Sequence, residues 1–309
     1  MKIQTFSIVV GTRACNARCP FCVSRMTGFE ELPKTRNINE RNFAKAARLA
    51  ELAGTTTVLM TGKGEPTLYP AQITHYLELL RTWRFPFIEL QTNALEIGRL
   101  ARDGKSKIPD LTEGTLRTWW NLGLNTIAIS VVDVNAAPNK AVYHEDYPEL
   151  ATTIAFLHGL GFSVRLCVMM QRPYVDSWAR LGEVIAFCKK NGVEQLTVRT
   201  IRKPENTHDP DASAYVMEHG LTDAEIAAIH GWIDRNGVRL MSLMHGAAVY
   251  DYGGQNVCLS DCLTLDPTGD DIRTLIFYDD GRIAYDWQYD GAVLVGGNAP
   301  EPHLTQIKT

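Results

Sequence analysis

Three cysteines lie close together near the start of the chain, in the segment GTRACNARCPFCVSRMTG. Cys15, Cys19 and Cys22 are spaced so that one short loop can wrap all three thiolates around a single cluster. Three thiolates hold three of the four irons of a cubane, whereas a cluster that only carries electrons normally has protein ligands on all four. The spacing therefore indicates an iron–sulfur cluster whose fourth iron is open to a small chelating ligand.

Zinc is the alternative occupant of this loop. A zinc knuckle needs a fourth cysteine or histidine at short spacing. The first such residue after Cys22 is His75, although a distant ligand such as Cys258 could complete a zinc site. We favour the iron–sulfur cluster.

A second motif, TGKGEPTLYP at residues 61–70, follows a β-rich run. Gly62 and Gly64 allow the backbone to approach a ligand closely. The Glu65 carboxylate can accept a hydrogen bond from an ammonium group. The competing interpretation is an ordinary turn before the next helix, with Pro66 as the breaker.

The two motifs together resemble those of the radical S-adenosylmethionine (SAM) superfamily. The first matches its CxxxCxxC pattern, with the aromatic Phe21 directly before the third cysteine, and the second matches its GxGEP variant. The resemblance implies that the open iron binds the amino and carboxylate groups of SAM. An electron from a donor such as flavodoxin or ferredoxin then breaks a carbon–sulfur bond, and the resulting 5′-deoxyadenosyl radical abstracts hydrogen from a substrate. By the same resemblance, Gly62, Gly64 and Glu65 bind the methionine amino end of SAM.

Two further segments are similar to the family over shorter stretches. LQTNA at 90–94 resembles its Thr-Asn-Gly motif and makes Thr92 and Asn93 pocket candidates, although Ala94 stands where the family has glycine. IAISVVD at 127–133 resembles the fourth strand of the family, whose small polar residue meets the SAM ribose or carboxylate. Ser130 is the candidate there, with Asp133 second.

Two arginines occur inside apolar, strand-like runs. Arg165 lies in SVRLCVMM and Arg199 in LTVRTI. An unpaired charge in such a run is costly to bury. Each arginine therefore either pairs with a carboxylate or faces the barrel interior, where it meets SAM or substrate.

Strand-like and helical patterns alternate over the first two thirds of the chain, which is typical of βα units around a parallel sheet. The predicted strands are 5–10, 56–61, 86–91, 125–131, 162–170 and 193–201. The predicted helices are 39–53, 71–83, 146–159, 177–190 and 222–235. Both motifs follow predicted strands, and in βα folds the loops at the carboxyl ends of the strands build the active site. We therefore expect an α/β fold, a partial (β/α)6 barrel of the radical SAM type, and the resemblance covers about residues 5–201.

A second cysteine pair, Cys258 and Cys262, follows a glycine-containing polar segment that we interpret as a loop. The pair could bind part of an auxiliary iron–sulfur cluster, act as a redox pair or place a thiol in the active site. No cysteine follows Cys262, so a second cubane would need His245, Asp261 or Asp266 to complete it.

The last third of the chain is predicted to cap the barrel. Residues 203–220 lack a clean period and are interpreted as a long surface loop or lid. Residues 272–288 alternate around Asp280-Gly281, a type I′ turn signal that predicts a β-hairpin. We divide the chain into a core barrel at 1–202 and a C-terminal cap at 203–309.

Composition narrows the class of protein. The 309 residues carry a net charge of −4 with a pI near 6.1, which gives no reason to expect non-specific nucleic-acid binding. No stretch approaches membrane-spanning length. Seven cysteines, an odd number in a chain of this size, favour reduced thiols, so we expect a cytoplasmic protein.

The sequence predicts an enzyme whose radical acts on a nucleotide or another small molecule. The hairpin segment loosely resembles the molybdopterin GTP cyclase branch of the family and its branches with C-terminal cysteine modules, and the likeness to the GTP cyclase favours this substrate class. The alternative is an enzyme that modifies a ribosomal peptide or activates a protein. Outside the enzymes, a non-enzymatic iron–sulfur electron carrier would fit the cysteines but would not bind SAM. The substrate, the fate of SAM and the oligomeric state are not predicted.

Overall fold

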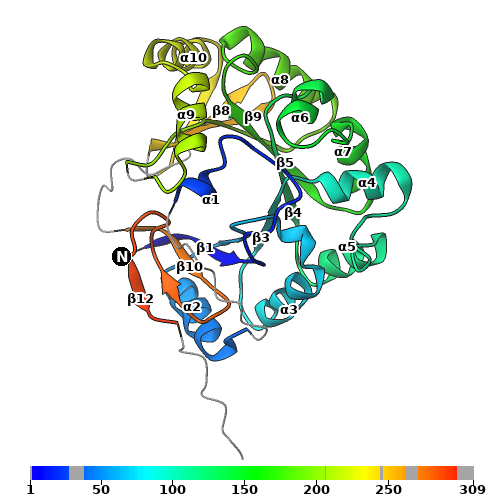
Figure 1. Ribbon diagram of the computed structural model, residues 1–309, viewed down its shortest axis with the longest axis vertical. Helices are drawn as coiled ribbons and strands as arrows, with labels where there is room; N and C mark the ends of the chain where they lie inside the picture. Colours follow the sequence, from blue (N-terminus) through cyan, green and yellow to red (C-terminus); the bar gives the residue numbers. More distant parts are fainter. Residues whose placement is uncertain (1, 28–37, 206, 244–245, 262–270, 298–309) are drawn as a thin grey trace, which may run out of the picture.

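The computed structural model describes residues 2–27, 38–205, 207–243, 246–261 and 271–297. Its described strands form one sheet of 12 strands in the order β12-β11-β10-β1-β2-β3-β4-β5-β6-β9-β8-β7. Figure 1 shows the sheet as a curved wall with helices around its outside. The α/β barrel fold expected from the sequence is confirmed.

Six parallel strands form the central part of the sheet, in chain order. They are β1 (Ile3–Val9), β2 (Thr57–Thr61), β3 (Phe87–Thr92), β4 (Thr126–Val131), β5 (Ser163–Met170) and β6 (Gln195–Thr200). Each of the six predicted strands is therefore present, with ends shifted by a few residues at most.

Two strands from the last third of the chain extend this parallel sheet. β9 (Gln255–Asp261) pairs in parallel with β6, and β10 (Ile272–Phe277) pairs in parallel with β1. Antiparallel strands continue each end: β8 (Ala248–Tyr252) and β7 (Val238–Ser242) beyond β9, and β11 (Ile283–Ala284) and β12 (Val293–Val295) beyond β10. The sheet thus runs through both parts of the predicted division at residue 202, which stays a prediction.

The helices follow the strands as βα units require. They are α1 (Val23–Met26), α2 (Glu40–Leu52), the 3-10 helix η1 (Pro66–Leu68), α3 (Pro70–Leu80), α4 (Leu95–Asp103), α5 (Glu113–Asn121), α6 (Ala136–Val142), α7 (Leu150–Gly159), α8 (Trp178–Lys190), α9 (Pro210–His219) and α10 (Asp223–Asn236). The five predicted helices correspond to α2, α3, α7, α8 and α10. The sequence did not predict α1, η1, α4, α5, α6 and α9.

The strands have an apolar outer face and a polar inner face. On β4, Ile127, Ile129 and Val131 are fully buried in the core shared with the helices, so the intervening residues face the concave side of the sheet, which we call the lumen. The same alternation gives the lumen-facing residues on β3, β4, β5, β6 and β9. They include Glu89, Gln91, Ser130, Arg165, Cys167, Thr197, Arg199, Cys258 and Ser260.

The segment 203–220 is not the loop predicted from the sequence, because α9 occupies Pro210–His219. Asp209 caps this helix, its Oδ1 accepting from the backbone N–H of Ala212 at 2.8 Å. Pro210 stands in the first turn, where proline starts a helix rather than breaking one. The Pro-Asp composition that suggested a loop is therefore a helix start signal.

The predicted hairpin is confirmed as β10 and β11, but its turn differs from the expected type I′. The Tyr278 N–H donates to the Arg282 carbonyl at 3.0 Å, which closes a three-residue loop. Within that loop only Gly281 has a positive φ, of 85°. This is a glycine-ended three-residue connection, since a type I′ turn needs positive φ at two central residues.

Among the helices that the structure describes, none is long and apolar enough to cross a lipid bilayer.

Candidate active site

The three N-terminal cysteines lie in the loop between β1 and α1. Cys15 is exposed, Cys19 and Cys22 are half-buried, and all three are free thiols. The Cys22 N–H donates to the Cys19 carbonyl at 3.3 Å, which folds the loop back on itself. Burial raises the pKa of Cys19 well above its ordinary value, and the neighbouring thiols of Cys22 and Cys15 raise it further. The structure therefore brings the three predicted ligands together on one loop.

This cysteine loop rests on the glycine-containing loop after β2. A Cβ atom built on Gly64 would overlap the Ala14 carbonyl oxygen and stand 2.7 Å from that of Thr12. A Cβ on Gly62 would stand 2.8 Å from the Val10 carbonyl oxygen. Both distances are too short for a real side chain. The two glycines therefore let the backbones of the two loops touch.

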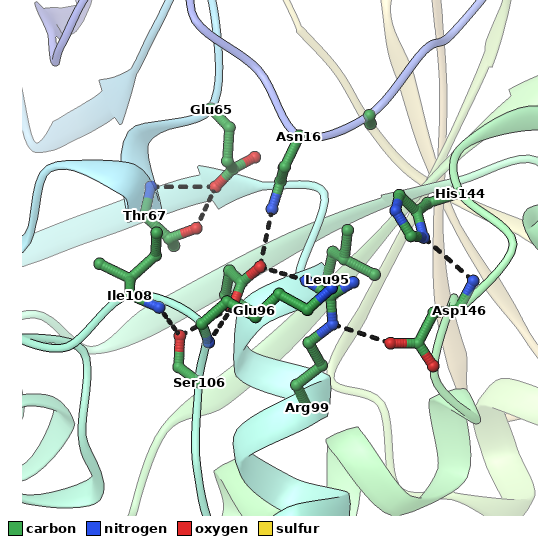
Figure 2. Close-up of polar contacts among 12 residues, drawn as sticks. Asn16, Glu65, Thr67, Leu95, Glu96, Arg99, Ser106, Ile108, His144 and Asp146 are labelled. Atoms are coloured by element: carbon green, nitrogen blue, oxygen red, sulfur yellow. Dashed lines mark hydrogen bonds and ion pairs between the residues drawn. The ribbon is translucent and has the colours of Figure 1, made fainter.

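Glu65 joins the ends of β2 and β3. Its Oε1 accepts from the Thr67 N–H at 3.0 Å, from the Thr67 hydroxyl at 2.6 Å and from the Thr92 hydroxyl at 2.6 Å. Its Oε2 accepts from the Asn93 N–H at 2.9 Å. Figure 2 shows the contacts with Thr67. Burial raises the pKa of this carboxyl, and the hydrogen bonds oppose that rise.

The Glu65 contacts show what the motif does in this fold. A carboxylate has about four lone-pair sites, and three of the four bonds fall on one oxygen. Oε2 therefore keeps capacity for a further donor. Its predicted bond to the SAM ammonium stays a prediction.

The Thr-Asn-Ala segment after β3 also reaches the cysteine loop. Asn93 Nδ2 donates to Asn16 Oδ1 at 2.8 Å and lies 3.9 Å from the Cys15 sulfur. Ala94 has φ of 58°, a left-handed conformation that favours glycine. The chain thus has the left-handed backbone of a tight turn although alanine stands at this position.

A charged network that the sequence did not predict supports the cysteine loop from below (Figure 2). Asn16 Nδ2 donates to Oε1 of Glu96, which is almost fully buried on α4. Oε2 of Glu96 accepts from the Ser106 hydroxyl at 2.8 Å and from the Lys107 N–H at 2.8 Å. Arg99 pairs with Glu96 and, through Nε, with Asp146 at 2.9 Å. The network consists of Asn16, Glu96, Arg99, Ser106, Lys107 and Asp146.

The pKa of Glu96 is lowered by this network. Burial by itself would raise it, but the hydrogen bonds from Ser106 and Lys107 and the charge of Arg99 outweigh burial. The sequence signal was weak, because Glu96 and Arg99 are three residues apart on a helix that was not predicted. Glu96 is a positioning residue, since it acts on the cysteine loop through Asn16.

Lys63, between the two motif glycines, was also missed. Its side chain is 6% exposed, and its Nζ donates to the Thr27 hydroxyl at 3.0 Å. Nζ also lies 5.6 Å from the centre of the Trp287 ring. Burial lowers the pKa of Lys63 to about 8. A lysine between two glycines of a tight loop was the available sequence signal.

Phe21 packs inside the cysteine loop. Its ring lies 6.4 Å from that of Tyr143 and 6.3 Å from that of Tyr215 on α9. An ion pair of 2.6 Å between Arg25 and Asp209 ties α1 to the start of α9. The helix found in place of the predicted lid therefore packs against the cysteine loop, and a cofactor contact for Phe21 stays a prediction.

The opposite side of the lumen is formed by β4, β5, β6 and β9. Ser130, Cys167, Thr197 and Cys258 are register partners across these four strands. Ser130 therefore has the predicted lumen position. Asp133 does not, because it is buried outside the lumen row and pairs with Arg180 at 2.7 Å.

The two strand arginines differ. Arg165 forms an ion pair with Glu89 of β3, which is the structural alternative predicted for it. Arg199 makes neither an ion pair nor a hydrogen bond with the part of the chain that the structure describes, and its Nε is buried without a partner. Only Arg199 is thus left for a ligand.

Cys258 lies in β9, a strand and not the predicted loop. The Gly-Gly pair that suggested a loop instead forms the turn between β8 and β9. Cys262 falls outside the described residues, so an auxiliary cluster at Cys258 and Cys262 stays a prediction. Within the described ranges, no three His, Cys, Asp or Glu side chains converge closely enough to hold a single metal ion.

Comparisons with known proteins agree with this geometry. A family model described as the radical SAM superfamily matches residues 9–188. No curated protein matches the chain by sequence. The crystal structure of Streptococcus suis SuiB bound to S-adenosylmethionine is similar, with a TM-score of 0.54 and 14% identity over 91% of this chain and 60% of SuiB. That of HydG, a maturase of the FeFe-hydrogenase, has a TM-score of 0.50 and 12% identity over 74% of this chain and 49% of HydG.

These structural likenesses show the fold alone. The chain spans about three fifths of the length of SuiB.

Proposed function

Because the chain belongs to the radical SAM superfamily, and is therefore an enzyme that uses a 4Fe–4S cluster and SAM, we propose that Cys15, Cys19 and Cys22 hold that cluster. The single observation that carries this assignment is the contact between the cysteine loop and the loops after β2 and β3. Gly64 touches the backbone of the cysteine loop, and Asn93 reaches both Asn16 and Cys15.

The donor set fits the cluster. Three free thiols on one loop leave the fourth iron of a cubane without a protein ligand. Partial desolvation of the thiol by the surrounding loops raises the pKa of Cys15 to about 11 although the residue as a whole is exposed, so the free thiol stays protonated at neutral pH. Metal binding requires the thiolate and releases that proton. Cluster binding at this loop therefore depends on pH.

When bound at this site, SAM would supply the 5′-deoxyadenosyl radical that abstracts hydrogen from the substrate. The residues of the chain place and shield it. Oε2 of Glu65 accepts from the SAM ammonium, and Glu65 is held for this by Thr67 and Thr92. Ser130 offers a hydroxyl from the lumen wall, and Phe21 keeps water away from the cluster loop.

The substrate that we propose is a nucleotide or another small molecule, bound in the polar lumen. An electron donor such as flavodoxin or ferredoxin reduces the cluster. The support for the lumen as the substrate site is its position beside the cysteine loop. Tyr143 connects the two, because the pKa of its buried hydroxyl is raised first by burial and then by neighbouring thiols that include Cys19 of the loop and Cys167 of β5.

Electron paramagnetic resonance of the reduced, reconstituted protein tests the assignment. We expect a 4Fe–4S signal whose g-values change when SAM is added, because SAM binds the open iron. Glu65→Gln should weaken the SAM dependence of this change at least about tenfold, since an amide is a poorer acceptor than a carboxylate for an ammonium donor. A signal that ignores saturating SAM would overturn the proposal.

A further inference from the structure

The charges that face the lumen do not balance. On the described strands β3 to β6 and β9, the lumen-facing ionisable groups other than thiols are Glu89, Arg165 and Arg199. Glu89 pairs with Arg165. The remaining positive charge belongs to Arg199, near the carboxyl end of β6.

Arg199 lacks the partners that a partly buried guanidinium normally has. Its register neighbours are Met169 on β5 and Ser260 on β9, and neither is acidic. Its Nε is buried and makes no hydrogen bond. A buried donor on a charged group costs free energy unless it is paired, and most buried polar groups in proteins are paired. An anion whose oxygens accept hydrogen bonds from this guanidinium removes that cost.

The Cys258 thiol marks the same place. Cys258 stands one lumen row from Arg199, because Thr197 pairs with Cys258 and Arg199 with Ser260. Burial raises the pKa of the Cys258 thiol, while the positive charges of Arg199 and Arg165 lower it. Both guanidiniums therefore act on this thiol, and it can report on anions that approach Arg199.

We propose that Arg199 binds the carboxylate or phosphate group of a small molecule that enters the lumen beside Cys258. This rests on the proposed function for the use of the lumen as the substrate site, and it gives the group bound at Arg199 as an acid. Guanidinium groups bind both anions through paired hydrogen bonds. The anion bound by Arg199 can therefore be either the acidic group of the substrate or the carboxylate of SAM.

Alkylation of Cys258 tests this without knowledge of the substrate. The reconstituted, cluster-containing enzyme is treated anaerobically with iodoacetate, an anion, or with iodoacetamide, its neutral analogue, and the Cys258 peptide is quantified by mass spectrometry. We expect the ratio of the iodoacetate rate to the iodoacetamide rate to fall at least about fivefold in Arg199→Gln, because the anion is no longer attracted. A change in the exposure or in the thiolate fraction of Cys258 alters the rates of both reagents equally and therefore cancels in the ratio.

Two further variants control the charge change. Arg239→Gln removes the same charge from the exposed strand β7 and should leave the ratio within about twofold of wild type. Arg199→Lys keeps a charge at the site and should keep part of the preference. An unchanged ratio in Arg199→Gln, or an equal fall in Arg239→Gln, would overturn the inference.

Adding SAM separates the two sources. If SAM abolishes the preference for iodoacetate while iodoacetamide still reacts, its own carboxylate occupies Arg199. If the preference persists at saturating SAM, the site accepts a second acid, as expected for the substrate. The same preparation is assayed for 5′-deoxyadenosine. Absence of that product from a cluster-containing wild type that also fails to bind SAM sinks the proposed function, whereas an unchanged alkylation ratio sinks only the role of Arg199.

Discussion

The two sides of the lumen differ in how completely their polar groups are satisfied. On the β1–β3 side, Glu65 accepts four hydrogen bonds and Glu96 is held by the Asn16–Arg99 network. On the β5–β9 side, the Nε of Arg199 is buried and has no hydrogen-bond partner among the described residues. Within the part of the chain that the structure describes, the β1–β3 side pairs its buried carboxylates, although Nη2 of Arg99 is buried without a hydrogen bond, whereas the β5–β9 side leaves the Arg199 guanidinium without a carboxylate.

This difference fits two functions, support of the cofactor on one side and binding of the substrate on the other. A cofactor of fixed shape is best served by a rigid and fully bonded support, because its position is the same in every turnover. A substrate that enters and leaves needs polar groups that are free before it binds. The comparison predicts that changes on the β1–β3 side affect cluster assembly and stability, whereas Arg199 affects only what the lumen binds.

The largest effect is expected from the cysteines themselves. Replacing Cys19 by Ala leaves two thiolates for the cubane, so iron content should fall below about a tenth of wild type. Cys188→Ala, which removes a buried thiol on α8, is the matched control and should keep its iron. Iron and sulfide analysis after reconstitution measures both. Full iron content in Cys19→Ala would contradict the ligand assignment.

The contact between the loops gives the next effect. Gly64→Ala places a methyl group against the Ala14 carbonyl, so the cysteine loop must shift and cluster occupancy should fall at least about threefold. Gly159→Ala is the control, because nothing lies within 4 Å of a Cβ there and the position ends a helix. That change should raise stability by up to about 1 kcal/mol. Equal occupancy in the two variants would break the claim that the glycines serve the loop contact.

Glu96 tests the support network through pH. Its folded pKa is lowered below the ordinary value of 4.5, so its carboxylate contributes stability above that pH and loses it as the pH falls through the folded pKa. Glu96→Gln should therefore cost about 2 kcal/mol near neutral pH, and the difference from wild type should shrink below about pH 4.5. Denaturant unfolding of the cluster-free wild type and Glu96→Gln, at neutral pH and below about pH 4.5, measures this difference in the free energy of unfolding. A cost that stays constant with pH would argue against a charged Glu96.

Ala94 provides the smallest effect. Ala94→Gly loses a buried methyl but relieves the left-handed strain at φ of 58°, and the two contributions of about 1 kcal/mol nearly cancel. Ala46→Gly, in the buried face of α2, loses a methyl without such relief and should cost about 2 kcal/mol. Thermal unfolding compares the pair. Equal losses would show that Ala94 is unstrained.

Local patterns predicted the part of the fold that depends on local sequence. The six strands were found because β-branched and apolar residues alternate or run together in short segments. The cysteine and GxGEP motifs were recognised because the residues of each lie close together in the sequence, at the spacing that binding of a cluster or its ligand requires. Helices α4 and α9 were missed for physical reasons: α4 buries Glu96 and Arg99 toward the core, and α9 begins with the Asp-Pro pair that usually signals a loop.

Long-range pairing could not be predicted from local patterns. β10 pairs with β1 although their register partners, such as Ile3 and Ile272, are 269 positions apart in the chain. β9 looked like a loop because a glycine turn precedes it. Likewise, the sequence treated Arg165 and Arg199 alike, because the carboxylate that distinguishes them, Glu89, lies two strands away from Arg165.

The central claim is that the cysteine loop, seated on the glycine and asparagine loops, holds a cluster that cleaves SAM. The direct measurement is anaerobic: the protein is reconstituted with iron and sulfide, SAM and dithionite are added, and 5′-deoxyadenosine is measured by mass spectrometry. We predict that wild type forms 5′-deoxyadenosine only with reductant present and that Cys19→Ala forms none. Undiminished product from Cys19→Ala, or no product from a cluster-containing wild type that does not bind SAM, would contradict the account.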